Sequence, residues 1–287
     1  MRWNVTVAGC ASRSAKYGLA SALVAAFLMT QAKTQNQDLS NVDLCNGINR
    51  AAADAQINGC SALIKSMENT KALAFAYNNR GNAHASEGDY DPAIKDYDEA
   101  IKLSPNDAKV FNNRGVAYQK KPDYDRAIED FDSAINIDPN YADAFANRAE
   151  TYEKKGDYQS ALKDFNEAIL LKPELTSLWN ERCWTRAILG ELQGAANDCN
   201  EAIRLNPNDA AAFDSRGLIA LKLSKWELAI NDYDSALLIA PKTPTALYGR
   251  GFAKLKGGNL AGGNADIAAA KAVEQNIVEE FVSFGLR

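Results

Sequence analysis

Histidine is nearly absent from this sequence of 287 residues, and His84 is its one example. A Ser-His or Cys-His mechanism of catalysis needs a histidine that is activated by its neighbours, and no such pattern surrounds His84. The sequence also lacks a phosphate-binding glycine loop, a dinucleotide-binding fingerprint and closely spaced metal ligands. These absences argue against an enzyme, and we expect neither a cofactor nor a bound metal.

Proline is scarce, and positive charge is not in excess. The eight prolines and the 46% hydrophobic content are those of a folded protein without long disordered segments. The 32 basic residues are outnumbered by 37 acidic ones, which gives a formal net charge of −5. Nonspecific binding of nucleic acid requires a basic field, so nucleic acid is not an expected partner.

One apolar run stands near the start of the chain. Basic residues precede a run from Tyr17 to Met29, and Thr30-Gln31-Ala32 offers a small-residue cleavage site. This layout predicts a secretory signal peptide over residues 1–32. An uncleaved membrane anchor is the alternative, although the run is short for a membrane-spanning helix. A lipoprotein-type box at Cys10 is disfavoured because the apolar run follows this cysteine. We therefore expect an exported chain, periplasmic or secreted, whose mature part does not insert into a membrane.

A period of 34 residues dominates the rest of the sequence. Five prolines recur at this spacing: Pro105, Pro139, Pro173, Pro207 and Pro241. They define six windows: 74–107, 108–141, 142–175, 176–209, 210–243 and 244–277. Such a period indicates stacked copies of one supersecondary unit.

The composition of each window predicts a helical hairpin. Window positions 8 and 20 are small, position 24 is mostly aromatic and position 27 is always alanine, as in Gly115, Ala127, Phe131 and Ala134. Positions 20, 24 and 27 lie on one face of a helix, and the small residues allow two helices to approach closely. A glycine or turn residue near position 15 separates the helices, an aspartate such as Asp123 can cap the second one, and the recurring proline ends it.

These residues resemble the tetratricopeptide repeat family. The stretch from Asn79 through Gly88-Asp-Tyr-Asp-Pro-Ala-Ile to Pro105 carries most of the signature of that family, and the resemblance covers residues 74–277. It implies an all-α, right-handed superhelical solenoid of about six helical hairpins. It also implies a concave groove that is lined by the first helix of each repeat and binds proteins or peptides.

Two flanking segments complete the expected solenoid. Residues 33–73 are predicted to form an N-terminal linker and a degenerate capping hairpin, which contains Cys45 and Cys60. Residues 276–287 are predicted to form a C-terminal capping helix. Terminal units of a solenoid need a covering face, which these segments would supply.

Two charged positions are invariant across the six windows. Position 7 is arginine and position 23 is aspartate: Arg80, Arg114, Arg148, Arg182, Arg216, Arg250 and Asp96, Asp130, Asp164, Asp198, Asp232, Asp266. A basic ladder for an acidic ligand is one interpretation. We favour structural ion pairs, because each arginine has its own carboxylate at a matched spacing and arginine suits a planar carboxylate partner.

The cysteines are distributed in the same manner. Cys183 and Cys199 replace the small residue at position 8 and the aromatic residue at position 24 of one hairpin. Together with the expected export, this pattern predicts the disulfides Cys183–Cys199 and Cys45–Cys60. Four buried thiols are the alternative.

The resemblance assigns positions 2, 5, 6, 9, 12 and 13 of each window to the groove. In the first three repeats these positions carry asparagines: Asn78, Asn79, Asn82, Asn112, Asn113 and Asn147. A row of asparagines can hold the backbone of an extended peptide, since each offers a donor and an acceptor. Alternatively, asparagine is simply tolerated on a solvated face.

Repeats four to six instead carry apolar residues at position 9: Trp184, Leu218 and Phe252. They predict an anchor patch for a partner, or burial against the C-terminal helix or a second subunit. We expect an interaction scaffold of the bacterial cell envelope with a protein or peptide partner. The alternative is a self-associating structural component that forms homo-oligomers.

Overall fold

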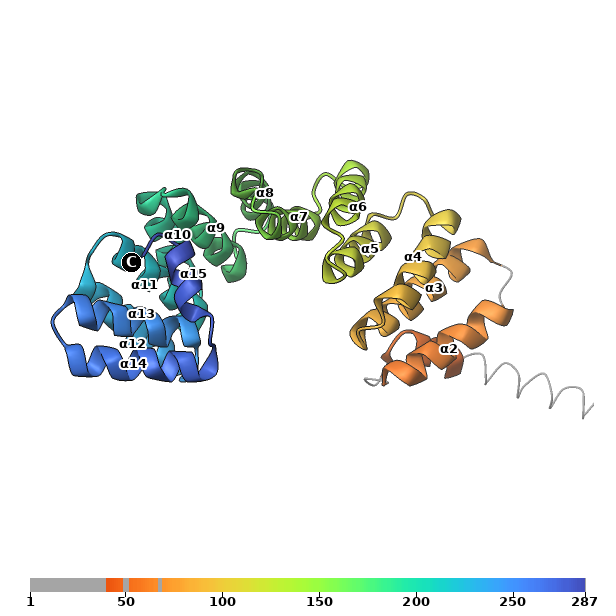
Figure 1. The fold of residues 1–287 in the computed structure, drawn as a ribbon. Helices are drawn as coiled ribbons and strands as arrows, with labels where there is room; N and C mark the ends of the chain where they lie inside the picture. The colour runs from red at the N-terminus through yellow and green to blue at the C-terminus, as the bar shows by residue number, and fades with distance from the viewer. Residues whose placement is uncertain (1–39, 49–51, 67–68, 287) are drawn as a thin grey trace, which may run out of the picture. The chain divides into compact units, whose positions relative to one another are not determined.

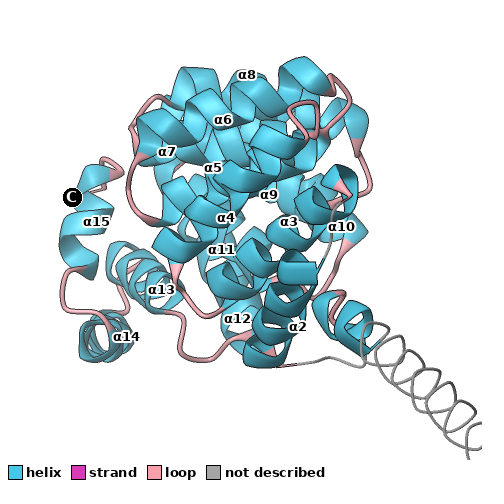
Figure 2. Cartoon of the chain, turned by 90° about the vertical axis from the view of Figure 1, so that its right-hand side faces the viewer, coloured by secondary structure: helices cyan, strands magenta, loops and turns pink. Residues whose placement is uncertain are grey.

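The computed structural model describes residues 40–48, 52–66 and 69–286, so the predicted signal peptide lies outside the described residues. All regular structure in this part of the chain is helical (Figure 2). The chain divides into two compact units, Met1–Pro105 and Asn106–Arg287. The prediction of an all-α solenoid of stacked helical hairpins is confirmed.

The first unit contains a disulfide-linked hairpin followed by a longer one. Residues 40–45 are helical and precede α2 (Ala53–Ser66). Helices α3 (Thr70–Ser86) and α4 (Tyr90–Leu103) then form the hairpin of the first repeat, and α2 packs on α3 (Figure 1).

The second unit contains five further hairpins and a short last helix. The first helices are α5 (Ala108–Lys120), α7 (Ala142–Lys154), α9 (Thr176–Leu189), α11 (Ala210–Lys222) and α13 (Pro244–Lys256). The second helices are α6 (Tyr124–Ile137), α8 (Tyr158–Leu171), α10 (Leu192–Leu205), α12 (Trp226–Ile239) and α14 (Leu260–Val273). The last helix is α15 (Ile277–Ser283).

The interior of each hairpin is made by the residues that repeat. Ala127, Phe131 and Ala134 are fully buried on one face of α6, and the equivalent residues of the other second helices are also buried, except Ile267 of α14, which is half-buried. Gly115 lies directly opposite Phe131, because a Cβ atom added there would stand 2.7 Å from the ring. The small residue at position 8 therefore provides the space that the aromatic residue at position 24 fills.

The aspartates after the turns cap the second helices to different extents. The side chain of Asp123 accepts a hydrogen bond from the backbone N–H of Arg126, and Asp157 accepts one from Ser160. Asp89 occupies the same N-cap position of α4, but its side chain makes no capping hydrogen bond. Capping by aspartate thus supports two of the three helix starts where the sequence indicated it.

The first helix of the first repeat begins earlier than its window. Helix α3 starts at Thr70, one turn before residue 74, and the side chain of Asn69 accepts hydrogen bonds from the backbone N–H groups of Lys71 and Ala72. In the later repeats a proline stands three residues before the first helix, as Pro105 does before α5. The sequence has no proline at the corresponding place before residue 74, so nothing prevents the helix from starting at Thr70.

Candidate protein-binding surface

The invariant arginines and aspartates form a repeated ion pair inside each hairpin. Each arginine donates two hydrogen bonds, from Nε and Nη2, to the carboxylate of the aspartate 16 residues later, at donor–acceptor distances between 2.6 and 3.2 Å. In the third repeat, 18% of the Arg148 side chain and 8% of the Asp164 side chain are exposed. These charged side chains therefore form ion pairs within the hairpins, and they are not exposed as a basic ladder for an acidic ligand.

The same arginines also join neighbouring repeats of the second unit. Nη1 of Arg182 donates to Asn166 Oδ1 at 3.0 Å, and Nη1 of Arg216 donates to Asn200 Oδ1 at 2.8 Å. Arg148 and Arg250 reach Asp132 and Asp234 in the same way. Each of these arginines thus fixes its own hairpin and the junction with the preceding one.

An aromatic residue at position 4 covers most of these arginines. The guanidinium carbon of Arg182 lies 4.9 Å from the centroid of the Trp179 ring, and Arg148 lies 5.6 Å from that of Phe145. The sequence analysis did not use this position, although five of the six windows carry Tyr, Phe or Trp there. A cation over a ring face is attracted by the ring, so the aromatic residue adds to the ion pair.

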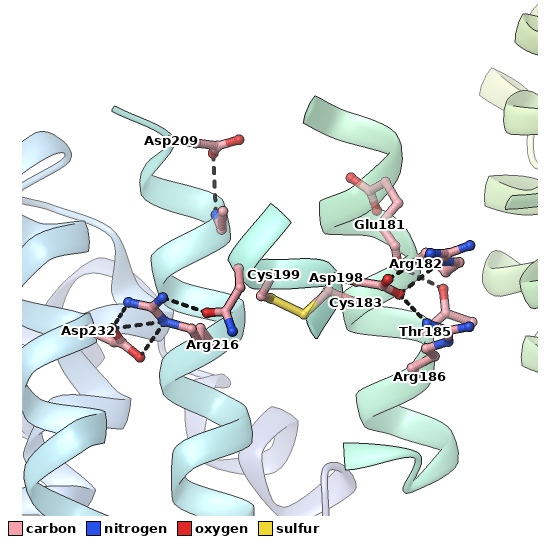
Figure 3. The surroundings of a disulfide bond; sticks show 12 residues. Glu181, Arg182, Cys183, Thr185, Arg186, Asp198, Cys199, Asp209, Arg216 and Asp232 are labelled. Carbon is pink, nitrogen blue, oxygen red and sulfur yellow. Dashed lines mark hydrogen bonds and ion pairs between the residues drawn. A yellow bond between two sulfur atoms is a disulfide. The ribbon is translucent and has the colours of Figure 1, made fainter. Parts of the chain in front are cut away.

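Two disulfides join helices within single hairpins. Cys45 and Cys60 are linked in the first unit, with 4.6 Å between their Cα atoms, and Cys183 and Cys199 are linked between α9 and α10, with 5.4 Å. Figure 3 shows the second disulfide beside Asp198, which accepts hydrogen bonds from both Arg182 and Arg186. This hairpin thus combines a covalent link with a buried ionic one.

Several of the asparagines assigned to the groove are engaged within the protein. Asn79 Nδ2 donates to the carbonyl oxygen of Cys45 at 3.2 Å, and Asn82 Oδ1 accepts from the Tyr97 hydroxyl at 2.8 Å. Asn147 Nδ2 donates to Asn112 Oδ1 at 2.8 Å, and Asn112 is buried. The assignment of Asn112 to an open groove is therefore corrected, because its amide is used between α5 and α7.

The remaining asparagines are less enclosed. Asn78 is half-buried and donates to Asn79 Oδ1 at 3.4 Å, and Asn113 is half-buried on α5. The asparagines thus connect adjacent helices at least as much as they face outward, which favours their structural interpretation.

The apolar residues at position 9 do not form an open patch. Leu218 is 2% exposed and belongs to the hydrophobic core of repeats five and six, so its assignment to the groove surface is corrected. Trp184 packs edge-on against Phe284, with 4.8 Å between ring centroids. Phe252 packs against Trp226 and under the Lys256 ammonium group. For Trp184 the structure shows burial against the C-terminal segment, which was one of the alternatives to an anchor patch for a partner.

The first helices of the second unit share one surface. We call this surface, which is formed by α5, α7, α9, α11 and α13, the first-helix face. Hydrogen bonds cross it from repeat to repeat: Gln119 Nε2 donates to Thr151 Oγ1 at 2.9 Å, and the Thr185 hydroxyl donates to Glu153 at 2.6 Å. Helix α11 also contacts both α9 and α13 directly. The first-helix face is therefore continuous from α5 to α13 within this unit.

Acidic residues occupy the middle of the first-helix face. Burial and the negative charges of Glu153 and Glu150 together raise the pKa of Glu181 to about 7, against the opposing effect of Lys154. Burial also raises the pKa of Glu153, while its hydrogen bond from Thr185 opposes the change. Glu181 stands at position 6, where the first three repeats carry asparagine, and this exchange was the signal that the sequence analysis missed.

The raised pKa of Glu181 gives an expected pH dependence of stability. Since this pKa is higher in the folded chain than in the unfolded one, the folded chain gains stability as the pH falls through 7. We expect the free energy of unfolding to increase by about 1 kcal/mol from Glu181 between pH 8 and pH 6. Glu181→Gln should be more stable than the wild type at pH 8 and lose this advantage towards pH 5.

Thermal melting followed by circular dichroism at several pH values measures this effect. Glu129→Gln, on the exposed surface of α6, is the matched control and should leave the pH profile of the wild type unchanged. Parallel profiles for Glu181→Gln and the wild type would contradict the proposed environment of Glu181.

The described residues carry neither a cluster of metal ligands nor a membrane-spanning helix. Within 40–48, 52–66 and 69–286, no group of three or more His, Cys, Asp or Glu side chains could hold a metal ion. In the same ranges, no helix has the length and apolar character needed to cross a membrane.

Comparison with known families and structures agrees with this fold. Residues 81–121 match the family described as TPR repeat, and residues 108–141 and 142–175 each match the family described as tetratricopeptide repeat. The last two ranges have the bounds of the second and third windows. Among curated proteins, no sequence gave a significant match.

Several solved structures resemble the chain at low sequence identity. A tetratricopeptide repeat protein from Parabacteroides merdae has a TM-score of 0.67 and 15% identity, covering 87% of this chain and 99% of its own. PilF from Pseudomonas aeruginosa has a TM-score of 0.64 and 16% identity, covering 75% and 98%. YrrB, described as a TPR protein with an unusual peptide-binding site, has a TM-score of 0.54 and 24% identity, covering 65% and 94%. These similarities establish the fold alone.

Proposed function

Since the chain is a tetratricopeptide repeat protein, we propose that it is a non-enzymatic scaffold that binds a protein or peptide partner on the first-helix face of its second unit. One observation carries this proposal. The residues that repeat, namely the Arg–Asp pairs and the alanines, are used inside the hairpins, whereas the first helices carry residues that differ between repeats, such as Asn147 and Glu181 at position 6. A surface whose chemistry changes along its length suits a ligand that is itself not repetitive.

One of the similar structures supports a peptide as the kind of ligand. YrrB is described as having a peptide-binding site, and it shares this fold. The first-helix face of our chain carries carboxylates at Glu150, Glu153 and Glu181. These groups would accept hydrogen bonds and positive charge from a partner.

We further propose that the protein acts in the bacterial cell envelope, periplasmic or secreted. The leader-like residues 1–32 support export. The two disulfides support an oxidising compartment, because cytosolic thiols are kept reduced. Fractionation of cells followed by intact-mass measurement tests this proposal, which expects a chain that begins after Ala32 in the periplasmic or secreted fraction.

Site-specific photo-crosslinking in cells tests the scaffold function. A photoreactive amino acid replaces Glu150 on the first-helix face or, as the matched control, the exposed Glu129 on α6. We expect a discrete crosslinked protein from position 150 and none from position 129. Identical products from both positions, or none from position 150, would contradict a partner on this face.

The alternative function is self-association, and light scattering of the purified chain separates the two. A stable oligomer whose crosslink from position 150 joins two copies of the chain would favour a structural component. A monomer whose crosslink from position 150 joins a different protein supports the scaffold.

A further inference from the structure

The fifth repeat departs from the others where its second helix begins. The N-cap of α12 is Lys225, whose side chain makes no capping hydrogen bond, whereas the other five repeats carry aspartate, glutamate or asparagine at this position. Ser224 before it has a φ of 55°, in the left-handed region where most of the other repeats carry glycine. Leu228 is 54% exposed at a position where the other repeats have proline, arginine, serine or glycine.

None of these three residues favours the helix that they begin. A lysine cannot accept hydrogen bonds from the first backbone N–H groups of a helix, and its charge is unfavourable near the positive end of the helix dipole. A serine at a positive φ is less favourable than glycine, and an exposed leucine gains little from burial. Residues that break local rules without stabilising the fold are expected at functional sites.

Two grooves share Lys225 and Leu228 in their walls. The larger has a volume of about 640 Å³ and is lined by the half-buried Trp226 and Ile230 of α12 and by the turn that joins α13 to α14. The smaller has a volume of about 270 Å³ and is lined by side chains of α10 and α11 and by the exposed Leu223. Grooves of this size and composition can receive apolar or aromatic side chains of a partner.

The walls of both grooves carry an excess of positive charge. The smaller groove is lined by Arg216 and Lys225 with a single carboxylate, which already accepts hydrogen bonds from Arg216. The larger groove is lined by Lys225 and Lys254, with Glu227 as its single carboxylate. Lys254 is paired with Asp266 at 2.8 Å, whereas no residue in the described part of the chain forms an ion pair with Lys225. Lys225 therefore supplies the charge that a ligand can neutralise.

The repeats that build the grooves also differ in charge from the rest of the array. Residues 74–209, the first four windows, contain 16 basic and 25 acidic residues, whereas residues 210–277 contain eight basic and six acidic ones. An acidic ligand is thus repelled by most of the array and attracted to its last two repeats.

We propose that the two grooves beside Leu228 are a docking site for an acidic segment of a partner protein, with apolar side chains that fill the grooves and a carboxylate that pairs with Lys225. The apolar side chains contact Trp226 in the larger groove and Leu223 in the smaller one. This site is centred on the start of α12, so it is additional to the partner surface proposed above, which contains Glu150 and Glu181.

Selection of random peptides displayed on phage, with the purified intact chain as the target, tests the proposal. The chain with both Lys225→Asp and Leu228→Ser serves for counter-selection, because aspartate and serine stand at these positions in the third repeat. We expect the enriched peptides to combine Asp or Glu with Leu, Phe or Trp. Enriched peptides without acidic residues, or a selection in which no peptide distinguishes the two chains, would overturn the proposal.

Single variants separate binding from folding. Lys225→Asp should weaken an enriched peptide about tenfold, measured by fluorescence anisotropy, because it reverses the charge that the peptide neutralises. The same variant should raise the melting temperature, because aspartate at this position caps α6 and α8. Ser224→Gly removes the serine at positive φ beside the grooves and should leave the peptide affinity unchanged. An enriched peptide that binds the Lys225→Asp chain as tightly as the wild type would contradict the role of Lys225.

The oligomeric state distinguishes a partner from a second copy of the chain. If light scattering shows an oligomer that Lys225→Asp converts into a monomer, the grooves hold a second copy and the proposed partner is overturned. If the peptides bind as expected while position 150 gives no crosslink, this inference stands and only the partner on the first-helix face fails.

Discussion

Replacing Arg148 by alanine is expected to lower the free energy of unfolding by roughly 2–4 kcal/mol, because it leaves the buried carboxylate of Asp164 without its cation. Arg148 donates from Nε and Nη2 to Asp164, at 2.7 Å each, and from Nη1 to Asp132 of the preceding repeat. Burial alone would lower the pKa of Arg148, but the hydrogen bonds to these two aspartates raise it above its usual value. The same substitution therefore affects one hairpin and one junction.

Two comparisons separate the loss of this pair from a general effect of removing arginine. Arg204→Ala removes a solvent-exposed pair with Glu201 and should leave the melting temperature nearly unchanged. The double variant Arg148→Met with Asp164→Leu should melt closer to the wild type than Arg148→Ala does, since it leaves no unpaired buried charge. Equal melting of Arg148→Ala and the wild type would show that the pair does not stabilise the fold.

Removing the Cys183–Cys199 disulfide is expected to cost about 3 kcal/mol, as estimated for a closed loop of this length. Replacing both cysteines by alanine should lower the melting temperature by roughly 6–12 °C if the conversion typical of domains this large applies. The Cys45–Cys60 bond closes a loop of similar length in the first unit, with a sequence separation of 15 compared with 16. Its removal should expose amide hydrogens of the first unit to exchange before those of the second.

Reduction gives an independent measurement of the same bonds. Reductant should lower the melting temperature of the wild type and leave that of a variant without these four cysteines unchanged. Thiol titration of an unfolded, unreduced chain that begins after Ala32 should detect no free thiol. Four reactive thiols would mean that the cysteines are not paired.

The hairpin architecture was predictable because the residues that build it recur. Ala127, Phe131 and Ala134 and nearly all of their equivalents in the other repeats are buried, so their period gives the helix face, the turn and the helix end together. The start of α3 at Thr70 was not predictable from the windows, because Asn69, which caps this helix, lies outside the first window.

The candidate surface was harder to predict, because its residues act across repeats. The 34-residue windows assign Asn112 and Asn147 to the groove. They do not reveal that the side-chain amide of Asn147 donates a hydrogen bond to that of Asn112. Trp184 had an apolar position in the fourth repeat, and its partner Phe284 lies a hundred residues further along the chain. Contacts of this kind depend on how far the last segment folds back, which no local pattern encodes.

Several arginines at position 7 bind both their own repeat and the preceding one. This arrangement affects how the protein can gain or lose whole repeats during evolution. Arg148 faces Asp132, Arg182 faces Asn166 and Arg250 faces Asp234, always from position 7 of one repeat to position 25 of the one before. If residues 142–175 were excised, Arg182 would meet Asp132 in place of Asn166, so the new joint would be as well matched as the old ones. Whole units can therefore be lost or duplicated without redesigning the joints, and evolution can alter the extent of this surface in steps of 34 residues.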